Sequence, residues 1–187
     1  MLLFQDKIPV NQEAFAAKVI SISKSLGINP DWLMICMITE CGLDSTAMNS
    51  IGAGGLIGFM PDTAKSLGTT VTDLVNMSNV DQLDYVYKYF APYAGKYASG
   101  ICLKIIDFFP AAILNWNNDK YVFEGYGFTA QQLAQANQPL DVNKDGLITM
   151  ADFKQYYYNF LKGYNISQEV IDDFMTGAVT NAAKKKD

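Results

Sequence analysis

A run of seven apolar residues, Trp32–Ile38 (WLMICMI), limits the possible folds of this chain more than any other segment. Asn29 can cap a helix here and Pro30 suits its first position, whereas Gly42 suits the residue just after its end. Because the run is apolar on every side, we expect a short helix that is buried all round. The pattern therefore predicts a core helix that ends near Glu40.

The rest of the chain is also predicted to be mainly α-helical. After Asn11, which we expect to act as a cap, apolar residues follow the 3.6-residue period of a helix that Gly27 ends. Five glycines over residues 42–58 mark an irregular segment that can include short strands. Further helices are expected from Pro61, over 78–93, near 101–108 and 110–116, after Thr129 and after Ser167.

The composition excludes several classes of chemistry. The chain contains no histidine and no arginine, and its 14 basic residues are all lysine. Ser-His-Asp and Cys-His catalysis, imidazole-ligated metals and bidentate arginine clamps on phosphate are therefore excluded. The net charge of −5 disfavours a nucleic-acid partner. Proton transfer near neutral pH would have to use a carboxyl group, and the only glutamates are Glu13, Glu40, Glu124 and Glu169.

Other features bear on where the chain acts. Three cysteines, Cys36, Cys41 and Cys102, are too few for a disulfide framework and predict reduced thiols. The start of the sequence acquires charge too early for a signal peptide, and no run approaches the roughly 18 apolar residues of a membrane span. We expect synthesis in the cytoplasm, with no membrane span. The Lys184–Lys186 run is expected to be a solubilising tail.

Residues 141–152 match an EF-hand calcium loop. The ligands at loop positions 1, 3, 5, 7, 9 and 12 would be Asp141, Asn143, Asp145, the backbone carbonyl of Leu147, Thr149 and Asp152. Gly146 stands at the sharp turn of position 6. Asp instead of Glu at position 12 predicts modest affinity with competition from Mg²⁺, and a single loop favours a structural Ca²⁺ over a sensor. The alternative is a turn of similar sequence that binds no metal.

The domain organisation follows from the same region. The sequence pattern changes near residue 128. We therefore predict one domain over residues 1–128 and a helix–calcium loop–helix segment over residues 129–187, packed on the first.

Glu40 is the most informative of the glutamates. It lies in the last turn of the apolar helix, where burial and the negative end of the helix dipole both disfavour a charged carboxylate. Both effects are expected to raise its pKa, as a general acid near neutral pH requires. The glycine-rich segment after it allows a ligand to approach the backbone closely. The alternative interpretation is that Glu40 is the exposed polar end of a core helix.

Residues 32–68 carry a longer pattern around Glu40, WLMICMITECGLDSTAMNSIGAGGLIGFMPDTAKSLG. This segment resembles the soluble lytic transglycosylase and goose-type lysozyme families, in which a catalytic Glu ends a buried helix. A Gly-Ala-x-Gly-Leu segment and an apolar pair with Pro and Thr-Ala follow in these families. Glu40 matches the catalytic Glu, residues 52–57 (GAGGLI) match the glycine-rich segment, and residues 60–64 (MPDTA) match its continuation. The resemblance implies a lysozyme-like helical domain.

The resemblance also implies which residues line the sugar cleft. The expected substrate-binding positions are Cys41, Gly55, Leu56, Gly58, Phe59, Asn115 and Trp116. Residues 109–116 (FPAAILNW) look like the family's Ala-Ala-Tyr-Asn segment, with Leu114 in place of Tyr. Cys41 replaces a family Ser and Gly58 replaces a family Gln, and either change alters substrate contacts. With the calcium-type loop, the chain looks most like phage-encoded muralytic proteins, which act on the cell wall from the virion or after lysis.

In these families one carboxylic acid protonates the oxygen between N-acetylmuramic acid and N-acetylglucosamine, and the resemblance gives this role to Glu40. In a transglycosylase the same carboxylate then removes the proton of the muramic C6 hydroxyl, giving a 1,6-anhydro product. A hydrolase (muramidase) needs a second carboxylate, for which Asp44 and Asp62 are nearest. Asp44 is better suited to capping a loop, so the transglycosylase is favoured.

Two further alternatives remain open at the level of sequence. The changes at Cys41 and Gly58 are compatible with a catalytically weak glycan-binding or structural virion protein that calcium stabilises. A chitin-type polymer is the other alternative, because it is chemically related to the glycan strands of peptidoglycan. In each case the expected partner is a polysaccharide of N-acetylated sugars.

Overall fold

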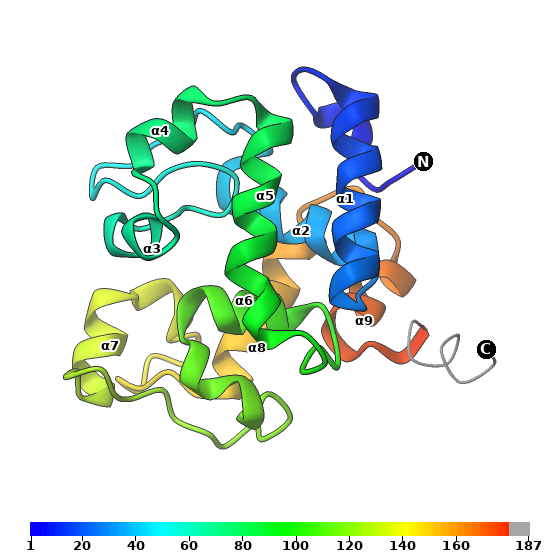
Figure 1. The fold of residues 1–187 in the computed structure, drawn as a ribbon. Coiled ribbons are helices and arrows are strands. Elements are labelled where there is room, and N and C mark those ends of the chain that lie inside the picture. The colour runs from blue at the N-terminus through cyan, green and yellow to red at the C-terminus, as the bar shows by residue number, and fades with distance from the viewer. Residues whose placement is uncertain (180–187) are drawn as a thin grey trace. The chain divides into compact units, whose positions relative to one another are not determined.

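A computed structural model describes residues 1–179, which are mainly α-helical, as the sequence predicts (Figure 1). The α-helices are α1 Gln12–Leu26, α2 Pro30–Cys41, α3 Pro61–Ser66, α4 Val71–Asn76, α5 Asn79–Phe90, α6 Ile101–Phe108, α7 Ala130–Ala136, α8 Met150–Lys162 and α9 Gln168–Thr176. Short 3₁₀ helices are η1 Gln5–Lys7, η2 Ala91–Tyr93, η3 Pro110–Asn115 and η4 Gln138–Leu140. Lys184–Lys186 lies outside the described residues.

The chain divides into two compact units, Met1–Leu103 and Lys104–Asp187, and the division falls within α6. This division comes earlier in the sequence than residue 128, near which the change of pattern indicates a boundary. None of the helices described over residues 1–179 is long and apolar enough to cross a membrane.

In the first unit α2 is the core helix. Its residues Trp32–Ile38 are all buried, which confirms the central prediction from the sequence. The side chain of Asn29 accepts a hydrogen bond from the amide of Asp31 (3.0 Å), and Gly42 ends the helix in the left-handed conformation. α1 packs against both α2 and α5, as Figure 1 shows. α2 therefore lies within a group of packed helices.

Some local expectations differ from the structure. Asn11 precedes α1 but has φ 56° and makes no capping bond; its side-chain amide donates instead to Oδ1 of Asn79 (3.1 Å). A tertiary partner has here replaced a local cap. The helix expected near 110–116 is the 3₁₀ helix η3, and α4, which the side chain of Thr70 caps, was not predicted.

In the second unit the chain that follows α6 pairs with the end of the calcium-type loop. The amide of Phe123 donates to the carbonyl of Ile148 (3.0 Å), and the amide of Met150 donates to the carbonyl of Tyr121 (2.8 Å). The ring of Phe123 packs in an aromatic cluster whose other members are Phe108, Phe109, Tyr121 and Phe153. These contacts join the residues before 128 to those after it, which accounts for the earlier division.

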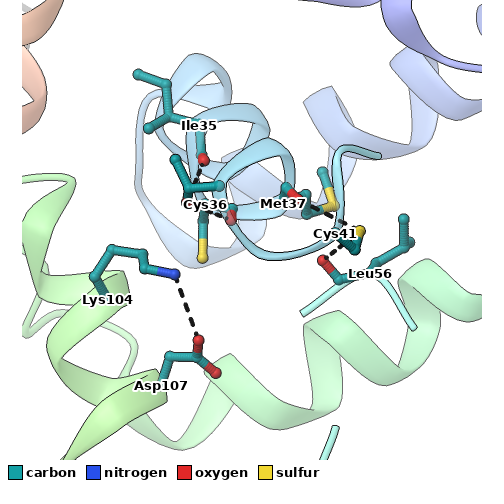
Figure 2. Close-up of polar contacts among 8 residues, drawn as sticks. Ile35, Cys36, Met37, Cys41, Leu56, Lys104 and Asp107 are labelled. Carbon is teal, nitrogen blue, oxygen red and sulfur yellow. Dashed lines mark hydrogen bonds and ion pairs between the residues drawn. The ribbon is translucent and has the colours of Figure 1, made fainter. Parts of the chain in front are cut away.

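The second unit also contains a buried cation. Lys104 is 1% exposed, and its Nζ lies 3.6 Å from Oδ2 of Asp107 (Figure 2). The same Nζ lies 5.1 Å from the ring centroid of Tyr157. Burial raises the pKa of Asp107, and the Lys104 ammonium opposes that rise. Removing one partner alone would leave the other charge poorly compensated. This ion pair is therefore a structural element of the unit.

Candidate active site

Glu40 lies in the last turn of α2, as predicted, but it is exposed. The expectation that the folded chain itself buries this carboxylate is wrong. The buried part of α2 ends at Ile38. Beyond it, the Cys41 side chain contacts the glycine-rich segment at the carbonyl of Leu56. Adjacent residues of a helix point in different directions, so covering Cys41 leaves Glu40 accessible to solvent.

The glycine-rich segment folds into a tight antiparallel turn. Gly54 and Phe59 exchange both backbone hydrogen bonds, at 3.1 and 2.8 Å. A Cβ atom at Gly54 would lie 2.9 Å from the carbonyl oxygen of Ala47, so only glycine fits. Gly55 and Gly58 have φ values of 81° and 64°, which also favour glycine. The glycines are thus required by the turn itself.

The turn brings Gly58 against the carboxylate of Glu40. A Cβ atom at Gly58 would lie 3.4 Å from Oε2 of Glu40. Two segments that the sequence pattern assigned to one site therefore meet in the structure. Because Gly58 has no side chain, its backbone borders the carboxylate directly.

Cys41 joins the end of α2 to the same turn. Its Sγ lies 3.3 Å from the carbonyl oxygen of Leu56 and 3.4 Å from that of Met37, as Figure 2 shows. Burial raises the pKa of the Cys41 thiol to about 12. The thiol is therefore protonated near neutral pH, so that it serves as a hydrogen-bond donor and not as a nucleophile. Cys41 positions the backbone of the turn.

Replacing Cys41 tests this positioning role. Cys41→Ser keeps a donor for the Leu56 carbonyl and is expected to leave the free energy of unfolding nearly unchanged. Cys41→Ala removes the donor and is expected to lower it by about 1 kcal/mol, the typical net value of one hydrogen bond. Urea unfolding of both variants measures the difference. Equal destabilisation by Ser and Ala would mean that the thiol acts only by packing.

Gln82, which the sequence pattern did not identify, organises the segment around the turn. This fully buried residue of α5 accepts a hydrogen bond at Oε1 from the amide of Leu56 (2.5 Å). Its Nε2 donates to the carbonyls of Ser45 (3.0 Å) and Leu74 (2.7 Å). The signal in the sequence was a glutamine on the apolar side of a predicted helix. A polar side chain that is buried there is expected to form hydrogen bonds with backbone groups.

Leu56 and Phe59, expected to line the cleft, are 0% and 2% exposed. The Phe59 ring packs edge-on against Tyr89, with ring centroids 6.3 Å apart. Gly55 is buried as well, with Gln82 against it. Within this structure the side chains of Leu56 and Phe59 belong to the core, so that only backbone atoms of these residues are suited to substrate contact.

Asp44 has the local role that its position favours. Its Oδ1 accepts hydrogen bonds from the amide (2.9 Å) and the hydroxyl (2.6 Å) of Thr46. Both bonds lower the pKa of Asp44, and the bond from the Thr46 hydroxyl has the larger effect. The carboxylate is thus engaged in a loop turn. Asp62 is exposed in the first turn of α3.

Asn115 and Trp116 belong to the second unit, whereas Glu40, Cys41 and Gly58 belong to the first. Both Asn115 and Trp116 are half-buried, and Nζ of Lys154 lies 5.6 Å from the ring centroid of Trp116. The structure therefore brings together the residues of the pattern around Glu40. Asn115 and Trp116 lie together at the end of η3 in the second unit.

The calcium-type loop has the turn that its sequence requires. Carboxylate oxygens of Asp141 accept hydrogen bonds from the amides of Asp145 (3.2 Å) and Gly146 (2.9 Å), and Oδ1 of Asp145 accepts from the amide of Leu147 (2.9 Å). Asn143 Oδ1 also accepts from the Asp145 amide (3.0 Å). Gly146 has φ 85° at the sharp turn. The side chains at positions 1, 3 and 5 are thus gathered over one turn of backbone.

Position 12 of the loop is tied to the start of α8. The carboxylate of Asp152, which is 6% exposed, accepts hydrogen bonds from the amide and the hydroxyl of Thr149 in a capping box. Over residues 1–179 no group of three or more Cys, Asp or Glu side chains stands ready as a metal site. The donor chemistry of the loop, which consists of carboxylate, amide and hydroxyl oxygens, nevertheless fits a hard cation such as Ca²⁺.

Comparison with protein-family models and with curated proteins finds no match to this chain.

Proposed function

We propose that this protein cleaves the glycan strands of peptidoglycan between N-acetylmuramic acid and N-acetylglucosamine as a lytic transglycosylase, with Glu40 as its acid and base. The observation that carries the proposal is the meeting of Glu40 and Gly58, where the position of a Gly58 Cβ lies 3.4 Å from the carboxylate. A carboxyl group at a helix end beside an open backbone turn is the arrangement that the sequence resemblance requires.

In the proposed reaction the protonated Glu40 donates its proton to the bridging oxygen, and the bond from that oxygen to the muramic C1 breaks. Positive charge develops at C1 in an oxocarbenium-like transition state. The Glu40 carboxylate then takes the proton of the C6 hydroxyl while the C6 oxygen bonds to C1. The enzyme returns to its starting protonation state, and the product is a 1,6-anhydro sugar with no water consumed.

The exposure of Glu40 fits this proposal in one specific way. A protonated carboxyl is favoured when water is removed from around it. A glycan strand lying over the turn would cover Glu40 and remove that water, so that substrate would supply the burial which the folded chain lacks. The negative end of the α2 dipole acts in the same direction.

The hydrolytic alternative receives less support. An inverting hydrolase needs a second carboxylate that is available to activate water. The nearest one in sequence, Asp44, accepts two hydrogen bonds from Thr46 within its own loop. Attack of the C6 oxygen on C1 needs only one carboxylic acid, whereas attack of water needs a second carboxylate as base. The transglycosylase reaction is therefore the simpler one for Glu40 alone.

Zymography on purified sacculi tests whether the protein is an enzyme. We expect clearing by the unaltered protein and none by Glu40→Gln. Binding to sacculi without clearing, unaffected by Glu40→Gln, would instead identify a glycan-binding or structural virion protein. Zymography on a chitin gel separates the chitin-type substrate from peptidoglycan.

We also propose that the protein reaches the wall as part of a phage particle or after lysis. A net charge of −5 provides no electrostatic attraction to anionic peptidoglycan. Delivery by a larger particle would remove the need for such attraction. Peptidoglycan glycan strands are the partner in either case.

The calcium-type loop is proposed to hold one structural Ca²⁺ through Asp141, Asn143, Asp145, Thr149, Asp152 and the carbonyl of Leu147. When bound, the ion would neutralise the carboxylates of this turn. The end of the loop pairs with residues 121–123. Binding of Ca²⁺ would therefore stabilise that segment as well.

Adding Ca²⁺ is expected to raise the melting temperature by several degrees, because ligand at 100 times its Kd adds about 2.7 kcal/mol to the free energy of unfolding. Mg²⁺ should have a smaller effect, and Asp145→Asn should abolish the rise. Asp172→Asn, an exposed aspartate on α9, is the matched control. Differential scanning calorimetry measures these shifts; no shift at millimolar Ca²⁺ would mean that the loop binds no ion.

A further inference from the structure

The chain that precedes the calcium-type loop pairs with the end of that loop within the second unit. Val122 forms an antiparallel bridge with Thr149, which stands at loop position 9. Further along, the amide of Ala151 donates a hydrogen bond to the carbonyl of Asp119 (3.1 Å). The end of the loop that carries positions 9 to 12 is therefore attached to residues 119–122.

A lysine at the start of α8 extends this connection to Trp116. Nζ of Lys154 lies 2.8 Å from Oδ1 of Asp119 and 5.6 Å from the ring centroid of Trp116. The Lys154 side chain is 22% exposed, so its ammonium is partly removed from water, which strengthens a cation–π contact. Lys154 thus joins the start of α8 to both Asp119 and Trp116.

The same start of α8 is built from two of the proposed calcium ligands. Thr149 caps the helix and Asp152 lies in its first turn, and the two residues are joined in a capping box. A cation bound through Thr149 and Asp152 would therefore act on the residues that begin the helix. Asp141 and Asp145 bring two further carboxylates to the loop, and these like charges repel one another in the ion-free protein. Binding of the ion would remove this repulsion and stabilise the start of α8.

We propose that Ca²⁺ binding regulates how firmly Trp116 is held, and that Lys154 transmits the effect. With the ion bound, the start of α8 is fixed and Lys154 stays against Asp119 and the Trp116 ring. In the ion-free protein the start of α8 opens more readily, so that these contacts are lost in a larger fraction of molecules. This regulatory role goes beyond the structural role that we propose for the ion above.

The coupling has a consequence for substrate binding. Trp116 is half-buried and is one of the residues predicted to contact the glycan. A side chain that is fixed in advance binds a ligand more tightly than a mobile one, because less conformational freedom is lost on binding. Glycan binding would therefore become stronger with Ca²⁺. This consequence rests on the proposed function, whereas the coupling between the loop and Trp116 does not.

A Ca²⁺ titration of the full-length protein, followed by tryptophan fluorescence, tests the coupling without substrate. The chain has two tryptophans, of which Trp32 is 1% exposed in the first unit and Trp116 is half-buried beside a cation. Movement of the Lys154 ammonium changes the field at the Trp116 ring and hence its emission. We expect the emission to change with Ca²⁺ along the binding curve that calorimetry gives. Trp116→Phe should abolish the change.

Lys154→Met separates the coupling from Ca²⁺ binding, since it removes the ammonium and keeps an apolar chain. It should lose most of the fluorescence change, while calorimetry still detects Ca²⁺ binding. Asp119→Asn, at an exposed aspartate, should also reduce the change, because Lys154 loses its ion-pair partner. The matched control is Lys162→Met, the same replacement at the other end of α8, where Nζ of Lys162 lies 5.6 Å from the ring centroid of Tyr158. It should leave the change intact.

The outcomes separate the coupling from the catalytic proposal. Ca²⁺ binding without a change in Trp116 emission, or a change that persists in full in Lys154→Met, would overturn the coupling. Absence of Ca²⁺ binding to the unaltered protein would overturn it as well, even if sacculus clearing persists. A Trp116 signal that requires both Ca²⁺ and Lys154 would support the coupling, even if the unaltered protein clears no sacculi.

Discussion

Glu40→Gln is expected to lower the rate of sacculus clearing by about 10³-fold, since general acid–base catalysis contributes about 10² to 10⁴. Glutamine preserves the shape of the side chain but cannot donate a carboxyl proton or accept one from the C6 hydroxyl. Turbidity loss of purified sacculi at equal protein concentration measures the rate.

The matched control is Glu13→Gln, the same chemical change at an exposed glutamate in the first turn of α1. It should clear sacculi at the original rate. Because Glu40 is exposed, its replacement should shift the unfolding midpoint little. A folded Glu40→Gln protein that retains full activity would remove Glu40 from the reaction.

Gln82→Leu is expected to cause the largest loss of stability, on the order of 3 kcal/mol or more, because each buried backbone group left without a partner costs about 1–3 kcal/mol. The groups affected are the amide of Leu56 and the carbonyls of Ser45 and Leu74. Clearing should fall as well, because the Leu56 amide belongs to the turn beside Glu40. Chemical denaturation and the clearing assay measure the two effects.

Gln82→Glu provides a sharper comparison. A carboxylate still accepts from the Leu56 amide but cannot donate to the two carbonyls, so we expect a large loss of stability here too. Gln135→Leu, at an exposed glutamine of α7, is the matched control and should change the unfolding midpoint little. If Gln82→Leu unfolds at the original denaturant concentration, the hydrogen bonds of Gln82 do not hold the segment.

Features with local causes were predictable from the sequence. The apolar run, the cap at Asn29 and the stop at Gly42 define α2 through neighbouring residues, and all of them are found in the structure. The capping box that begins at Thr129 and the cap at Ser167 were predictable for the same reason.

Features that depend on distant contacts were not predictable. The role of Gln82 depends on three backbone groups that are remote in sequence, and the exposure of Glu40 depends on which neighbour the turn covers. The joining of the chain across residue 128 depends on pairing between residues 121–123 and 148–150. Sequence periodicity reports the faces of an element but not the partner against which each face packs.

Mass spectrometry of the soluble fragments released from sacculi tests the central claim most directly. A transglycosylase that uses Glu40 alone should release muropeptides ending in 1,6-anhydromuramic acid, each lighter by one water than its hydrolytic counterpart. Glu40→Gln should release none of them. Fragments that carry reducing-end muramic acid, or anhydro fragments that still form with Glu40→Gln, would contradict the account.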